Sequence, residues 1–171
     1  MRLLTGQDIF KYCVERLAKP GDIFLFDRQG FFNYAIKIKT WSPVSHSEIY
    51  IGNGKTIGSR NGIGVGTYDI KLDGLAYILR PINEPDMDTM LAWHNKQIGQ
   101  KYDWFGILRF FTLGKPSLDK QFCSEHNARA YMTQNNVRLF SSKWDSDLIS
   151  PGDFLKSPSL EMVWEHNRNE N

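Results

Sequence analysis

One Asn-Gly pair constrains the fold of this chain more than any other feature. Asn53-Gly54 separates two strand-like runs, residues 44–51 and 55–60, and this dipeptide is the strongest short-range signal for a two-residue β-hairpin. A hairpin fixes the register of its two strands, and the alternation of side chains along the first strand then places His46 and Glu48 on one face. The sequence therefore predicts an antiparallel hairpin that carries an imidazole beside a carboxylate.

Length and charge narrow the range of functions. The chain has 171 residues, of which 41% are hydrophobic, enough for one domain with a proper core. Its 21 basic and 19 acidic residues leave a formal net charge of +2, without a basic run or an acidic tail. Because nucleic-acid binding normally leaves a clustered basic footprint, we expect no nucleic acid among the partners.

Hydrophobic spacing and turn residues predict an α+β arrangement, with the strands in the first half of the chain and mostly helices in the second. Residues 31–40 suit a helix better than a strand, although both patterns are present. The other predicted strands are 22–26, 63–68 and 75–80, and the predicted helices are 5–17, 86–99, 104–111 and a helix that begins at Cys123, with a last packed segment after the turn at 150–153.

The N-terminus and the cysteines bear on the compartment. The first residues lack the apolar stretch of a secretory signal, and no run approaches the ~20 apolar residues of a membrane span. We therefore expect synthesis in the cytoplasm and no integral membrane segment, which leaves release by lysis or packaging in a virus particle open. Cys13 lies among apolar residues of the first helix and is predicted to be buried, so a disulfide with Cys123 is not expected.

The segment Phe122-Cys123-Ser124-Glu125 has the pattern of a helix start. Ser124 is a suitable capping residue, and Glu125 favours the positive end of the helix dipole. A thiolate is favoured at the same end, and a strand-borne imidazole such as His46 can take up the thiol proton. Cys123 and His46 are thus the candidate nucleophile and base of a thiol hydrolase, a chemistry that needs no cofactor.

Two other chemistries are less well supported by the sequence. A zinc site built from His46, Glu48, Cys123 and His126 is not expected, because the chain shows no paired Cys or His spacing. His126 itself is predicted to lie on a polar helix surface. The glycines at 62, 64 and 66 suit turns and bulges beside a hairpin better than a phosphate-binding loop, since no strand-to-helix setting surrounds them.

Five short motifs occur in order along the chain. They are Gly21-Asp22-Ile23-Phe24-Leu25, Ser45-His46 with Ile49-Tyr50-Ile51-Gly52-Asn53-Gly54, Tyr102-Asp103, Phe122-Cys123-Ser124-Glu125 and Ser150-Pro151-Gly152-Asp153. Together they resemble the circularly permuted papain-like enzymes of the NlpC superfamily, and the YiiX-like branch in particular. The resemblance covers about residues 20–155.

The resemblance implies a permuted papain-like (NlpC-type) fold with an antiparallel sheet, in which the strand that bears His precedes the helix that bears Cys. It implies Cys123 as nucleophile and His46 as general base. The family position of a third, orienting residue falls on Gly58, which has no side chain. Glu48, on the face of His46, is the best substitute and Ser59 the next.

A second donor for the oxyanion, beside the backbone N–H of Cys123, is left open between Tyr102 and Gln121. Residues 1–165 are predicted to form one papain-like domain and 166–171 a flexible tail. The predicted activity is cleavage of an amide bond, most plausibly in a cell-wall (peptidoglycan) peptide, with a peptide or acyl substrate as partner. The alternatives are a lipid acyltransferase or thioesterase, as in the related lecithin retinol acyltransferase-like enzymes, and a non-catalytic binding or structural module, for instance in a virus particle.

Overall fold

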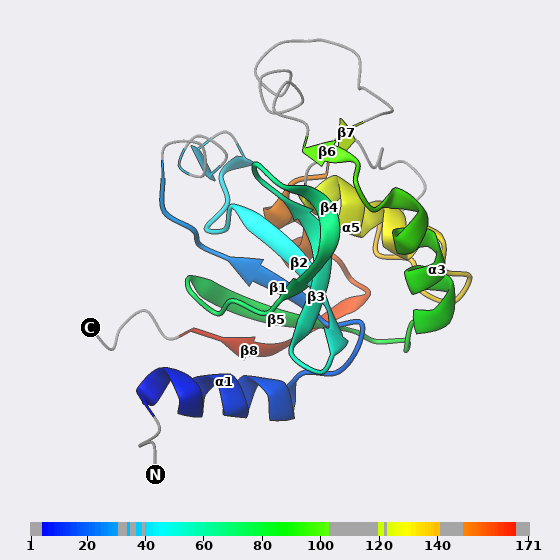
Figure 1. Cartoon of the computed structure of the whole chain (residues 1–171). Helices are drawn as coiled ribbons and strands as arrows, with labels where there is room; N and C mark the ends of the chain where they lie inside the picture. Colours follow the sequence, from blue (N-terminus) through cyan, green and yellow to red (C-terminus); the bar gives the residue numbers. More distant parts are fainter. Residues whose placement is uncertain are drawn as a thin grey trace.

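The computed structural model describes residues 5–30, 34, 37–38, 40–102, 120–121, 123–140 and 149–166. Its centre is a six-stranded sheet in the order β4-β3-β2-β1-β5-β8, and every neighbouring pair is antiparallel (Figure 1). The strands are β1 Ile23–Phe26, β2 His46–Gly52, β3 Lys55–Arg60, β4 Gly64–Asp69, β5 Leu75–Pro81 and β8 Leu160–Glu165. The predicted α+β class and antiparallel sheet are confirmed.

Helices cover the two faces of the sheet. They are α1 Gly6–Leu17, α3 Met87–Gln97, α5 Cys123–Met132 and the 3-10 helix η2 Pro151–Lys156. α1 packs through Val14 against one face, whereas α3 and α5 contribute Met90 and Tyr131 to the core on the other (Figure 1). A separate parallel pair joins β6 Lys101–Tyr102 to β7 Lys120–Gln121. The sheet therefore lies between two apolar cores.

The predicted hairpin is present. Asn53 and Gly54 both have positive φ, 52° and 66°, as a type I′ turn requires. The turn pairs Ile49 with Ile57 and Tyr50 with Thr56 across β2 and β3. This register brings the middle of β3 alongside Glu48.

Most predicted elements agree with the structure, and the differences are local. Strand β8 and the β6–β7 pair were not predicted. Of residues 31–40, those described, 34, 37, 38 and 40, are helical, while the predicted helix 104–111 lies outside the described residues. So does the predicted tail from 167 onward; residue 166 still donates its backbone N–H to the Ala76 carbonyl (2.8 Å).

The prediction for Cys13 is wrong. α1 begins with a capping box, in which Thr5 and Asp8 exchange hydrogen bonds. The helix lies along the outside of the sheet, so only a narrow stripe that includes Val14 is buried and Cys13 is exposed. Within the described residues, the helices are all too short or too polar to cross a membrane.

Contacts between α5 and β2 set the position of the first turn of α5. The Asn127 side-chain amide donates to Ser47 Oγ (2.9 Å), and the Tyr131 hydroxyl donates to the Gly21 carbonyl. The Ser124 side chain does not cap the helix as predicted, because its buried hydroxyl donates to the Ile149 carbonyl (2.6 Å). The bond from Asn127 to Ser47 holds the first half of α5, and with it Cys123, against the beginning of β2, while the other two bonds tie α5 to Gly21 and Ile149.

Candidate active site

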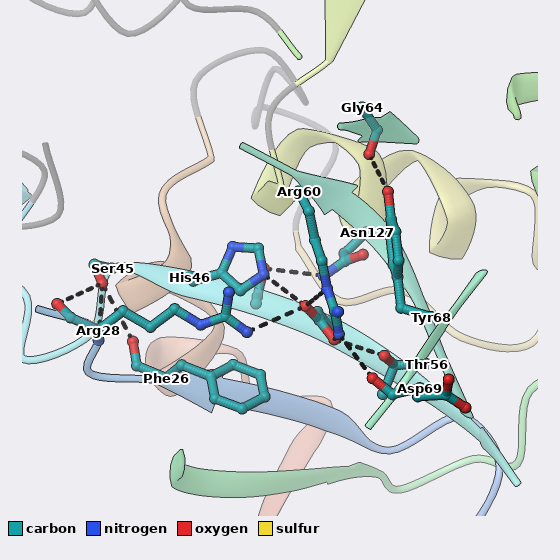
Figure 2. A network of polar contacts seen from close by, with 12 residues as sticks. Phe26, Arg28, Ser45, His46, Thr56, Arg60, Gly64, Tyr68, Asp69 and Asn127 are labelled. Atoms are coloured by element: carbon teal, nitrogen blue, oxygen red, sulfur yellow. Dashed lines mark hydrogen bonds and ion pairs between the residues drawn. The ribbon is translucent and has the colours of Figure 1, made fainter. Parts of the chain in front are cut away.

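His46 is the first residue of β2 and is almost fully buried, with 5% of the residue exposed. Its Nε2 lies 2.8 Å from Glu48 Oε1, two residues along the same strand face. The ring also packs on Phe26 of the neighbouring strand, with 5.8 Å between centroids. Strand alternation and an aromatic neighbour thus orient the imidazole, as Figure 2 shows.

Cys123, 2% exposed, is close enough to His46 for the two side chains to shift each other's pKa. Burial opposes ionisation of the thiol, but the charge and hydrogen bond of His46 and the backbone N–H groups of Ser47 and Ser124 outweigh it and lower the pKa of Cys123. The same contacts raise the pKa of His46 against the effect of burial. The geometry favours a thiolate–imidazolium pair.

Glu48 is completely buried and is ionised by its surroundings. Besides His46, it accepts from Thr56 Oγ1 (2.6 Å) and from two nitrogens of Arg60, Nε at 2.7 Å and Nη2 at 2.8 Å. Burial alone would raise the pKa of this carboxyl, but the hydrogen bonds and charges of His46 and Arg60 hold it far below the usual range. A fixed negative charge therefore lies directly behind the imidazole.

Gly58 and Ser59 take different places relative to this carboxylate. A Cβ built on Gly58 would lie 3.3 Å from Glu48 Cγ, so the missing side chain leaves the space that Glu48 occupies. Ser59 is buried on the strand face that also carries Ile57, toward the core with α5. The structure thus brings Glu48, and not Ser59, into hydrogen bonding with His46.

Two arginines complete the network and were not predicted. Arg60 lies on the Gly58 face of β3 and stacks over the Tyr68 ring, 4.2 Å from its centroid. Arg28, just after β1, reaches Glu48 Oε1 at 3.4 Å (Figure 2). A buried carboxylate needs cationic partners, so the burial of Glu48 was the signal that could have indicated them.

A second imidazole cluster lies one turn into α5. His126 is fully buried, so its predicted position on a polar surface is wrong; α5 is covered by the sheet on one side and by α3 on another. His126 Nε2 lies 3.1 Å from His94 Nδ1, and His94 Nε2 lies 3.3 Å from Thr67 Oγ1. Burial lowers the pKa of His94 to about 4 and that of His126 to about 3.

The side chains of Tyr102 and Gln121, predicted as oxyanion donors, lie outside the described residues, although their backbones pair in β6 and β7. Among the described residues, no three His, Cys, Asp or Glu side chains are grouped so as to hold a metal ion. Glu48 suits a metal poorly, since Arg60, Thr56 and His46 already donate to its oxygens.

Comparison with known proteins identifies the fold. Neither a protein-family model nor a curated protein matches the sequence. Among solved structures, the metalloprotein YiiX of Escherichia coli O157:H7 is similar with a TM-score of 0.66 over 88% of this chain and 98% of that chain, at 17% sequence identity. The chain has a YiiX-like fold.

Proposed function

We propose that this protein is a thiol hydrolase of the permuted papain-like (NlpC-type) group, which cleaves an amide bond through Cys123 and His46. The observation that carries this proposal is the continuous chain from thiol to imidazole to buried carboxylate, with Glu48 Oε1 2.8 Å from His46 Nε2. Such a chain activates a nucleophile and stabilises the imidazolium that takes its proton. The resemblance of the five short motifs to the NlpC superfamily supports the same chemistry.

In the proposed reaction, the Cys123 thiolate attacks the amide carbonyl and a C–S bond forms. The imidazolium of His46 gives its proton to the leaving amine as the C–N bond breaks. Water then attacks the acyl-enzyme, passes a proton to His46, and the C–S bond breaks to release the acid and restore the thiolate. Glu48 does not exchange a proton; it holds the ring and its charge in place.

The main argument for the alternative of a non-catalytic binding or structural module no longer applies. That reading depended on the absence of an orienting side chain at Gly58, and Glu48 supplies a carboxylate at the same place from the neighbouring strand. We favour a peptide amide in the bacterial cell wall over a lipid ester on the family resemblance alone. Both substrates use the same thiol and imidazole, so the test includes both.

Alkylation tests the activated thiol. At about pH 6 ordinary thiols are almost entirely protonated, whereas an ion-paired thiolate reacts. We expect iodoacetamide to modify Cys123 faster than Cys13, even though Cys13 is the exposed thiol. Peptide mass mapping after short exposures measures both rates in the same sample. Modification of Cys13 alone, in a folded protein, would refute the activated nucleophile.

Substrate cleavage tests the reaction itself. The wild-type protein is incubated with cell-wall stem peptides and, separately, with a fatty-acyl thioester, and the new amine or thiol is quantified against Cys123→Ala. We expect amine release from the peptides by wild type only. Turnover of the thioester without the peptides would move the protein to the acyltransferase or thioesterase alternative.

A further inference from the structure

Arg28 is the one cation of the described network that keeps substantial contact with solvent. Its side chain is 29% exposed, against 9% for Arg60. The guanidinium stacks over the Phe26 ring, 4.8 Å from its centroid, and ends beside His46 (Figure 2). Its backbone N–H donates to Ser45 Oγ (3.2 Å), which ties the loop after β1 to the residue before His46. Arg28 is thus held at the edge of the site.

The bond between Arg28 and Glu48 is the weakest in the network. Arg28 Nη2 lies 3.4 Å from Glu48 Oε1, whereas Arg60 donates to both carboxylate oxygens at 2.7 and 2.8 Å. A contact of 3.4 Å is long for a charge-assisted hydrogen bond. Arg60, Thr56 and His46 therefore satisfy Glu48 without Arg28.

The charges around the thiol do not cancel. Cys123 as thiolate balances His46 as imidazolium, and Glu48 balances Arg60, which leaves the positive charge of Arg28. Burial opposes that charge, while Glu48 and Cys123 favour it. The other carboxylates nearby are Asp27, which is paired with Lys37 at 2.6 Å, and the exposed Asp73. Among the described residues, those around Cys123 are left with about one unit of positive charge.

We propose that Arg28 is a specificity residue that binds a monoanionic group of the substrate, a carboxylate or a phosphodiester, beside the carbonyl that Cys123 attacks. A guanidinium that is stacked on an aromatic ring is pre-organised, and its planar fork matches both kinds of anion. The proposal deepens the proposed function and rests on it for the identity of the reacting thiol. The preferred substrate is then an acyl compound with a negative charge close to its scissile bond.

Two alkylating agents that differ by one charge provide the test. Iodoacetate and iodoacetamide both lose iodide to the thiolate, but only iodoacetate carries a carboxylate. We expect Arg28→Gln to slow the reaction of iodoacetate with Cys123 by about fivefold, the upper range for a partly exposed ion pair, while iodoacetamide reacts at nearly the wild-type rate. Arg28→Lys should retain most of the preference. Lys55→Gln, which removes an exposed charge paired with Asp69, is the matched control.

The ratio of the two rates separates the possible failures. An unchanged ratio in Arg28→Gln overturns the anion site and leaves the thiolate intact. No reaction of Cys123 with either reagent overturns the proposed function instead. A second experiment then tests the anion site directly. The NMR resonance of the Arg28 Nε–H group, identified by its loss in Arg28→Gln, is followed during titration with acetate and with dimethyl phosphate. A saturable shift supports the site and names the preferred anion, and no shift with either overturns it.

Discussion

Two buried histidines of this protein, in different surroundings, have pKa values shifted in opposite directions. His46, at the start of β2, and His126, in α5, are both nearly inaccessible to water. The pKa of His46 is raised, whereas that of His126 is lowered to about 3. Burial acts on both rings in the same direction, so the difference must come from their partners.

His46 lies between a thiol that can ionise and a carboxylate that is always ionised, and both favour the imidazolium. His126 contacts another imidazole, His94, and lies near the positive charge of Arg129. Both neighbours oppose a second positive charge, so the neutral ring is favoured. The first arrangement favours a protonated ring beside a fixed negative charge, while the second is a contact between two neutral rings of α3 and α5. The burial of a histidine therefore does not by itself indicate catalysis, because the groups that contact the ring set its protonation state.

Removing the charge of Glu48 should have the largest effect. Glu48→Gln keeps the shape of the side chain but leaves Arg60 buried beside a neutral amide, which we expect to cost about 3 kcal/mol in the free energy of unfolding. The imidazolium of His46 also loses its counter-charge, so alkylation of Cys123 at pH 6 should slow markedly. Denaturant unfolding and the alkylation rate measure the two effects separately.

Ser59→Ala is the matched control for that prediction. Ser59 is buried on the other face of β3, so its loss should leave the alkylation rate of Cys123 close to that of wild type. If Ser59→Ala slowed alkylation and Glu48→Gln did not, the orienting group would lie on β3, contrary to our assignment.

Acid should distinguish the two clusters by the pH at which each loses stability. The folded-state pKa values of His94 and His126, about 4 and about 3, lie below the ordinary value of 6.5. Their contribution is complete above about pH 6.5 and is lost as the pH falls, by up to about 1.4 kcal/mol per pH unit for each ring. Glu48, whose pKa is also lowered, begins to lose its contribution only below about pH 4.5.

The measurement is the free energy of unfolding between pH 7 and 5, for wild type and for His94→Gln with His126→Gln. Wild type should lose stability across this range, and the double variant should show a much flatter dependence. An equal slope in both proteins would mean that the buried imidazole pair does not control acid stability.

Local patterns predicted five of the six strands of the sheet and the contact between His46 and Glu48, but not how elements cover one another. The Asn53-Gly54 turn and strand alternation place His46 beside Glu48, and both rules act over a few residues. The errors at Cys13 and His126 concern burial, which depends on what packs against a helix: α1 is covered on one side and α5 on two. The roles of Arg28 and Arg60 depend on contacts 20 and 12 residues away in sequence, to which local periodicity is blind.

A smaller effect is expected at Thr56, which donates to the second oxygen of Glu48 (2.6 Å). Thr56→Val keeps the volume and removes this one hydrogen bond, at a cost of about 1 kcal/mol in the free energy of unfolding. Because Arg60 still donates to both oxygens of Glu48, alkylation of Cys123 should change less than in Glu48→Gln. A loss of reactivity as large as that of Glu48→Gln would show that Thr56 has a separate role in placing the carboxylate.

Gly58→Ala should give the smallest change in stability, because two effects oppose each other. The substitution restricts the unfolded chain, which stabilises by about 0.4–1 kcal/mol. The new methyl group would lie 3.3 Å from Glu48 Cγ, and Glu48 cannot retreat while Arg60 and Thr56 hold its carboxylate. We therefore expect unfolding free energy close to wild type but slower alkylation of Cys123, since a displaced carboxylate supports His46 less well.

In the Glu48→Gln background, the same substitution should leave the alkylation rate almost unchanged, because the charge that it displaces is already absent. Equal effects of Gly58→Ala in both backgrounds would mean that Gly58 does not influence the orientation of His46.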